Sequence, residues 1–124
     1  MNALSQMMIV GVAGFAGAVA RFGVAAAAAR IGLTFPLGTL FINVAGSFAL
    51  GMLIGWGIAK GTLPEHLRLA IGVGFLGAFT TFSTFAVETD GLLRSGATVS
   101  ASVYVLLSVV LAIVAARVGY ALMN

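Results

Sequence analysis

The fold is decided by an apolar stretch near the end of the chain, Val99–Met123, which reads VSASVYVLLSVVLAIVAARVGYALM. Arg117 is its only charged residue. An α-helix needs about 20 consecutive, mostly apolar residues to cross the hydrocarbon core of a bilayer. The stretch is long enough and apolar enough to do so, and it therefore predicts a transmembrane helix.

The composition of the whole chain agrees with that prediction. Of its 124 residues, 61% are hydrophobic and only 7% are charged, and the mean hydropathy is +1.18. Soluble domains carry about 25% charged residues, and a large exposed apolar surface does not survive in water. The sequence thus excludes a water-soluble globule. Cysteine is absent, which removes thiolate metal sites and thiol catalysis.

Three further apolar stretches lie between the charged residues. Together with the first they predict an all-α integral membrane protein with four transmembrane helices, at about residues 4–29, 37–59, 64–90 and 98–123. We expect them to form a single domain that spans residues 1–124. Thr62 and Glu65 have the spacing of a capping box, which predicts that Thr62 is the N-cap of the third helix. Because every connection is short, neighbouring helices are expected to run antiparallel.

The basic residues are balanced across the expected membrane. Three fall on each side: Lys60, Arg68 and Arg117 on one, and Arg21, Arg30 and Arg94 on the other. Because an excess of Lys and Arg normally sets orientation, this balance predicts insertion in both orientations and an antiparallel homodimer. The alternative is a single orientation, in which one charged loop residue has more influence than a simple count of basic residues gives it. The net charge of +3 is too small and too dispersed to indicate a nucleic-acid partner.

The third stretch concentrates hydroxyls and phenyl rings in the sequence FLGAFTTFSTF, at residues 75–85. These residues are mediocre helix formers, and they follow glycines, which are poor ones. The pattern predicts a third helix that is broken at mid-membrane, where freed carbonyls must meet protein, water or ions. Phe82 and Phe85 share a face, and they either face lipid, pack in the core, or turn their positive ring edges toward an anion.

Asn43 opens a helix face on which small residues recur at every fourth position: Ser47, Gly51 and Gly55. Small residues at that spacing let helices approach closely, so the face predicts helix packing. Asn43 differs, because a primary amide inside the bilayer is costly unless it is hydrogen-bonded. Its amide either bonds a neighbouring helix or donates into a pore.

Other polar residues within or near the spans also leave alternatives. Arg21 either extends to the interface or faces a wet cavity or a partner. Ser108, which shares a face with Tyr104, either bonds back to its own helix or faces a ligand. Glu88 and Asp90, at the end of the third span, are expected to be solvated or to pair with arginines.

The sequence offers no catalytic machinery. No Asp, Glu, Lys or His is expected at the membrane centre, and no nucleophile stands beside a base. We therefore expect neither an enzyme nor a proton-coupled pump. Gly72, Gly74 and Gly77 match G-x-G-x-x-G, but the strand, helix and acidic residue of a dinucleotide site are missing.

Three motifs occur in order along the chain: GAxxRF at residues 17–22, GTLxxNxxGSxxxG at 38–51 and GFLGxxTTFSTFxxE at 74–88. With the fourth helix they resemble the Fluc family of bacterial fluoride channels. The resemblance implies a passive, fluoride-selective channel that exports fluoride from the cytoplasm. It further implies a multi-pass protein of the bacterial inner membrane, and antiparallel homodimers with two fluoride pathways at the subunit interface.

The resemblance also implies roles for particular residues. The fluoride pore is expected to be lined by Asn43, Phe82, Phe85, Thr39, Ser83, Thr84, Tyr104 and Ser108. Arg21 matches an arginine near the aqueous vestibule. The carbonyls of Gly77 and Thr80 match those that hold a structural sodium ion on the dimer axis. Some members continue the hydroxyl track of the fourth helix, where this chain has Ala112.

Two other classes of membrane protein share the size and the span count. A small multidrug-type exporter, which exchanges protons for a cationic drug, needs a glutamate embedded in its first helix. The first span here offers Arg21 instead, which has the wrong sign. A purely structural subunit would explain the glycines but would leave the amide of Asn43 and the central hydroxyls without a purpose.

Overall fold

Helices account for nearly the whole chain in the computed structural model, which describes residues 1–124 and contains no strands. Their bounds are α1 (Ala3–Ala29), α2 (Leu37–Leu53) with its π-helical continuation η1 (Ile54–Ile58), α3 (Glu65–Leu67), π-helical η2 (Arg68–Leu76), α4 (Gly77–Phe79), α5 (Phe82–Arg94) and α6 (Thr98–Met123). Four stretches are long and apolar enough to cross a membrane: Ala3–Ala29, Leu37–Ile58, Glu65–Arg94 and Thr98–Met123. The prediction of an all-helical chain with four candidate spans is confirmed.

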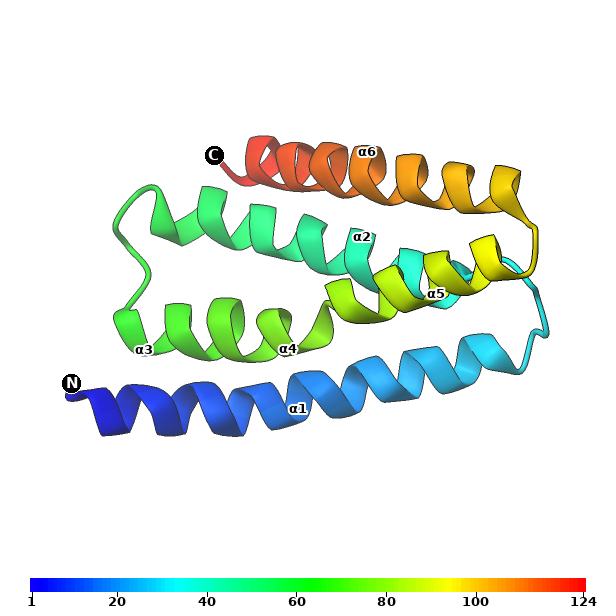
Figure 1. The fold of residues 1–124 in the computed structure, drawn as a ribbon. Coiled ribbons are helices and arrows are strands. Elements are labelled where there is room, and N and C mark those ends of the chain that lie inside the picture. Colours follow the sequence, from blue (N-terminus) through cyan, green and yellow to red (C-terminus); the bar gives the residue numbers. More distant parts are fainter.

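The four stretches are arranged as two parallel pairs (Figure 1). In one pair, α1 runs beside the α3–η2–α4 stretch. In the other pair, α2 runs beside α6. The two pairs point in opposite directions, because each short connection reverses the chain, and both termini therefore lie at the same end.

Glycines set the distance between α2 and α6. A Cβ added at Gly51 would overlap the carbonyl oxygen of Ala116, and one at Gly55 would stand 2.5 Å from that of Tyr120. On the facing helix, a Cβ at Gly119 would overlap the carbonyl oxygen of Phe48. The two backbones are therefore in direct contact, as small residues allow in membranes. The packing role expected for Gly51 and Gly55 is confirmed.

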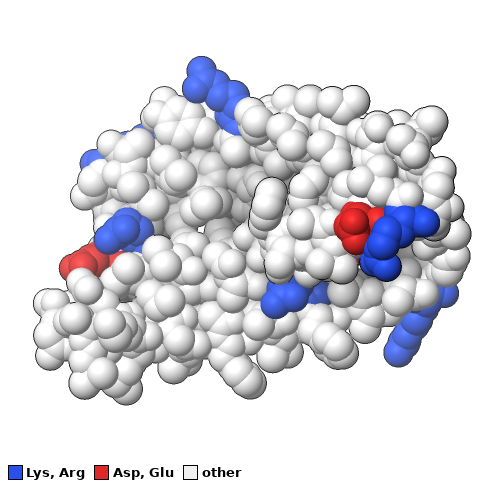
Figure 2. Space-filling view, viewed as in Figure 1, with Lys and Arg blue, Asp and Glu red and all other residues white.

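Most large apolar side chains lie on the outside of the bundle. Val12, Phe15 and Phe22 on α1 are each 74% exposed, whereas the fully buried large side chains are Tyr104 and Ile42. In the space-filling view, most of the visible face carries neither acidic nor basic atoms (Figure 2). Such a surface suits lipid and is incompatible with water.

The capping box expected at Thr62 does not form. Helix α3 begins at Glu65 with Pro64 at the N-cap, and the hydroxyl of Thr62 lies 3.5 Å from the carbonyl of Gly57, in the preceding helix. The reason is Pro64, which disfavours a helical conformation at Leu63 before it. A helix capped by Thr62 would need Leu63 as its first helical residue.

The third helical stretch also extends beyond the expected end near residue 90, to Arg94. Gly91 is accommodated inside the helix, where Asp90 and Arg94 form an ion pair of 2.7 Å. The helix stops only before Gly96, whose φ of +81° is a conformation that glycine adopts readily. Gly96 is thus the residue before which this helical stretch ends.

Candidate functional site

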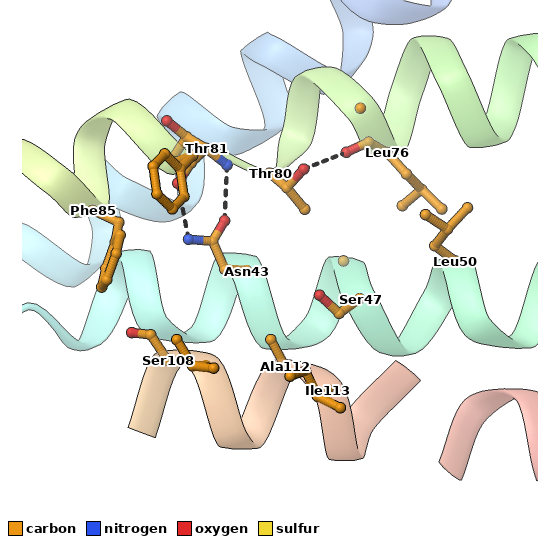
Figure 3. A pocket seen from close by; sticks show the side chains of 14 residues that line it. Asn43, Ser47, Leu50, Leu76, Thr80, Thr81, Phe85, Ser108, Ala112 and Ile113 are labelled. Atoms are coloured by element: carbon orange, nitrogen blue, oxygen red, sulfur yellow. Dashed lines mark hydrogen bonds between the residues drawn. The ribbon is translucent and has the colours of Figure 1, made fainter. Parts of the chain in front are cut away.

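A groove of about 370 Å³ runs between α2, the α4–α5 region and α6 (Figure 3). Of the residues expected at the pore and at the sodium site, it brings together Asn43, Gly77, Thr80, Phe82, Phe85 and Ser108. Thr81, Ser47 and Ala112 also line it. The expected pore residues Thr39, Ser83, Thr84 and Tyr104 and the vestibule residue Arg21 do not.

The chain leaves the helical conformation beside this groove. Helix α4 ends at Phe79, and Thr80 (φ −79°, ψ 155°) and Thr81 (φ −149°, ψ 119°) are extended before α5 starts at Phe82. Thr81 is the N-cap of α5, and its hydroxyl oxygen accepts the backbone N–H of Thr84 at 3.3 Å. Threonine is a favoured N-cap, so the hydroxyl-rich sequence explains why a new helix begins here.

Asn43 holds the interruption from the neighbouring helix α2 (Figure 3). Its Nδ2 donates to the carbonyl of Thr81 at 2.9 Å, and its Oδ1 accepts the N–H of Thr81 at 2.8 Å. The side-chain amide thus satisfies both backbone groups of one extended residue, as a neighbouring strand would. Because Nδ2 carries two hydrogens, one N–H of Asn43 remains without a partner in the groove.

Glu88 joins α5 to two other helices. Its Oε1 accepts the hydroxyl of Thr39 on α2 at 2.6 Å, and its Oε2 accepts the hydroxyl of Tyr104 on α6 at 2.9 Å. Hydroxyl–carboxylate bonds of this length are among the stronger hydrogen bonds. Glu88 therefore pairs with hydroxyls and not with an arginine, whereas Asp90 does pair with Arg94.

Sequence reasoning missed this cluster of Thr39, Glu88 and Tyr104 as a unit. The available signal was the position of Glu88, three residues after Phe85 and so on the same face of its helix. A second cavity of about 240 Å³, between this cluster and the α1–α2 connection, is lined by Thr39, Glu88 and Phe35. The cluster therefore lies between the groove and this second cavity, which is at one end of the bundle.

A series of neighbouring aromatic rings extends from the groove to the second cavity. Phe82 lies 5.5 Å from Phe85 between ring centroids, and Phe85 lies 5.2 Å from Tyr104. Tyr104 in turn meets Phe35 edge to face at 5.6 Å. Phe82 itself is 79% exposed, so it is not a core residue of this chain. The core-packing interpretation fails for Phe82 within a single copy.

Ser108 has a buried hydroxyl without a hydrogen-bond partner. The alternative in which it bonds back to its own helix is therefore wrong. Buried hydroxyls nearly always have a partner, and this one lines the groove from α6. Ser83 and Thr84 have a different place, since both lie in the first turn of α5 beside the hydroxyl of Thr81.

The carbonyls expected to bind sodium have lost their usual helical donors. Four residues after Gly77, the N–H of Thr81 donates to Asn43. Four residues after Thr80, the N–H of Thr84 donates to the hydroxyl of Thr81. Both carbonyl oxygens are thus without those donors, and neutral oxygens are ligands that hard cations accept. No cluster of acidic, His or Cys side chains offers an alternative metal site.

Comparison with known proteins places the chain in a family. A model of the family described as CrcB-like protein, Camphor Resistance (CrcB), matches residues 8–120. A protein named fluoride-specific ion channel FluC from Methylobacterium sp. (strain 4-46) is 43% identical over 121 residues, which are 98% of this chain and 97% of that protein.

Proteins of the same name from two other bacteria are similar to the chain. The one from Methylobacterium nodulans is 48% identical over 106 residues, 86% of this chain and 85% of its own length. The one from Prosthecochloris aestuarii is 40% identical over 118 residues, 95% of this chain and 92% of its own length. With matches of this extent, the chain belongs to the CrcB family of multi-pass bacterial membrane proteins.

Proposed function

We propose that this protein is a passive, fluoride-selective channel that carries fluoride out of the cytoplasm across the inner membrane. The relatives named fluoride-specific ion channels support the choice of ion. The observation that carries the proposal is the groove itself, where unpaired donors and phenyl rings meet. Beside the groove, the buried hydroxyl of Ser108 and one N–H of Asn43 are donors without a hydrogen-bond partner in the protein.

The chemistry of the groove suits a small, strongly hydrated anion. A pore must replace the water around an ion, yet bind it weakly enough to release it. Phe82 and Phe85 add ring edges, which carry the positive part of the aromatic quadrupole. No acidic or His side chain lines the groove, so the groove has no fixed negative charge and no side chain suited to relay a proton. This absence disfavours the proton-coupled exporter as the alternative.

The path is proposed to continue past Phe85 to the Thr39–Glu88–Tyr104 cluster and the second cavity. Thr39 and Tyr104 line this path, as the resemblance implies, and their hydroxyls would have to turn from the carboxylate of Glu88 to donate to fluoride. Ser83 and Thr84 contribute mainly by starting α5 at the edge of the groove. Arg21 matches the arginine that the resemblance places near the aqueous vestibule, and here its Nε–H donates to the carbonyl of Ala78.

A second copy in the opposite orientation is proposed to complete the channel. The groove is open on one side, and the highly exposed Phe82 lines it. The even division of basic residues supports insertion in both directions. In such an antiparallel dimer the interruption at Thr80–Thr81 lies at mid-membrane. The carbonyls of Gly77 and Thr80 from both copies would hold a sodium ion on the axis, which ties the two interrupted helices together.

Fluoride efflux from liposomes tests the proposed function. Purified protein is reconstituted into liposomes loaded with potassium fluoride, and external fluoride is read with an electrode after a potassium ionophore is added. We expect efflux that needs the ionophore, because a passive channel carries net charge, and little efflux from chloride-loaded liposomes read with a chloride electrode. Fluoride driven uphill by a proton gradient at fixed stoichiometry, or no efflux at all, would contradict the proposal.

A further inference from the structure

The C-terminal carbonyls of α4 need hydrogen-bond donors from outside their own helix, as at any helix end inside a membrane. The last carbonyls of a helix have no intrahelical donor, and lipid offers none in place of water. Thr80 N–H still donates to the carbonyl of Leu76 at 3.1 Å. Beyond it, the two extended residues carry the chain away, so Phe82 N–H, the regular donor to Ala78, belongs to the start of α5.

Arg21 on α1 donates to this end of the helix. Its Nε–H bonds the carbonyl oxygen of Ala78 at 3.0 Å, across 57 positions of sequence. The reach is set by close packing one turn earlier, where a Cβ at Gly17 would overlap the carbonyl of Phe75. Arg21 follows Gly17 by one turn on a helix that runs parallel to η2 and α4, so its side chain arrives at Ala78.

The charge of Arg21 has no acidic partner. The chain's three carboxylates are engaged elsewhere: Glu65 with Gln6, Glu88 with Thr39 and Tyr104, and Asp90 with Arg94. A cation at a helix C-terminus is stabilised by the partial negative charge of the last carbonyls. The end of α4 is therefore the only group that the structure provides to balance this half-buried guanidinium.

We propose that Arg21 is a positioning residue, which fixes the carbonyl end of α4 through its Nε–H and so holds Thr80 and Thr81 in their extended conformation. Arg21 secures the interruption from the α4 side, while Asn43 secures it from the groove side. The inference rests on the proposed function only where it states that fluoride flux depends on this geometry.

Three variants separate the hydrogen bond from the charge. In Arg21→Gln, a side-chain N–H stands the same number of bonds from Cα as the Nε–H, but the charge is gone. In Arg21→Met, a methyl group stands at that position, and both the donor and the charge are gone. In Arg21→Lys, the charge remains and the donor lies one bond further out. Arg117→Met is the matched control, because Arg117 is exposed, lies in a span and makes no side-chain hydrogen bond.

Hydrogen–deuterium exchange of the purified, detergent-solubilised protein is the first readout. We expect exchange in the peptide covering residues 77–85 to rise about tenfold in Arg21→Met, since an unsatisfied half-buried carbonyl shifts a local equilibrium by about that factor. Arg21→Gln should stay near wild type, Arg21→Lys should lie between them, and Arg117→Met should leave this peptide unchanged. Equal exchange in Arg21→Met and wild type would overturn the proposal.

Fluoride efflux from liposomes is the second readout. Positioning predicts that Arg21→Gln retains most of the flux while Arg21→Met loses about tenfold, in step with the exchange. If the charge acts only by attracting the anion, Gln and Met variants lose flux equally and Lys alone retains it, which would refute positioning. A wild-type protein that carries no fluoride would refute the proposed function, while the exchange series would still decide whether Arg21 holds the interruption.

Discussion

The α2–α6 pair and the interruption between α4 and α5 hold neighbouring helices together by opposite means. Between α2 with its continuation η1 and α6, the contact is backbone against backbone, at Gly51, Gly55 and Gly119. At the interruption the helix gives up internal bonds, and Asn43 and Arg21 from other helices replace them. We therefore expect added atoms to disrupt the α2–α6 contact, and lost hydrogen-bond donors to disrupt the interruption between α4 and α5.

The difference shows how a small membrane protein can place a polar site in an apolar chain. The glycine contacts fix the spacing between helices without using polar groups. The polar groups are then free to compensate the interruption, which leaves unpaired donors in the groove. Substitutions that add volume and substitutions that remove donors should therefore have different consequences in the two regions.

The largest effect is expected from added volume at the α2–α6 contact. In Gly51→Val, the new side chain would meet the carbonyl of Ala116, which is backbone and cannot rotate away. We expect a loss at or above the upper end of the 1–3 kcal/mol, roughly, that overpacking costs, with little folded protein recovered. Size-exclusion chromatography and thermal unfolding in detergent measure it.

Gly23→Ala is the control for that substitution, because a Cβ at Gly23 meets nothing within 4 Å. It should leave stability unchanged or raise it by up to about 1 kcal/mol, the difference in helix propensity. If Gly51→Val were as stable as Gly23→Ala, the backbone contact at Gly51 would not limit the side-chain volume between α2 and α6.

The second effect comes from removal of a donor and an acceptor at the interruption. Asn43→Leu keeps the volume of the side chain but leaves the N–H and the carbonyl of Thr81 unpaired. We expect about 2–4 kcal/mol of destabilisation, from two unsatisfied backbone groups, and loss of fluoride efflux. Ser47→Ala, one turn further along the same face, is the control for stability and should cost much less.

The third effect shows whether the phenyl rings of Phe82 and Phe85 serve fluoride efflux or the stability of the fold. Phe82→Ile and Phe85→Ile keep most of the apolar area, so each should cost under about 1.5 kcal/mol. Neither offers a positive ring edge, so fluoride efflux should fall steeply while the protein stays folded and the proposed dimer persists. Met at either position should retain more efflux than Ile because it is flexible and polarizable. Wild-type efflux from both Ile variants would remove these rings from the mechanism.

The positions of the four spans were predictable because the thickness of the bilayer sets their length. The observed bounds follow the apolar stretches closely, and the glycine face of α2 packs as its spacing indicates. Local signals failed where a neighbour in sequence overrode them. Pro64 prevents the capping box at Thr62, and the third helical stretch continues beyond residue 90 to Arg94.

The partners of the site residues were not predictable, because each joins helices that are distant in the sequence. Asn43 and Thr81 are 38 positions apart, and Thr39 and Glu88 are 49 apart. A periodic pattern states which residues share a face of one helix, but not which helix that face meets. The contact of Glu88 with Thr39 and Tyr104 needs the rotation of all three helices, which only the packed structure supplies.

The smallest effect on stability is expected at Ser108, which lies where the two regions meet. Its helix packs against α2 through glycines, while the residue lines the groove and its buried hydroxyl has no partner. Ser108→Ala removes a buried polar atom that makes no bond, so stability should be unchanged or rise by up to about 1 kcal/mol. If the hydroxyl donates a hydrogen bond to fluoride in the pore, fluoride efflux should nevertheless fall. A stable variant with reduced efflux would show that the unpaired donor is kept for the anion, whereas a clear loss of stability would reveal a structural partner and count against that role.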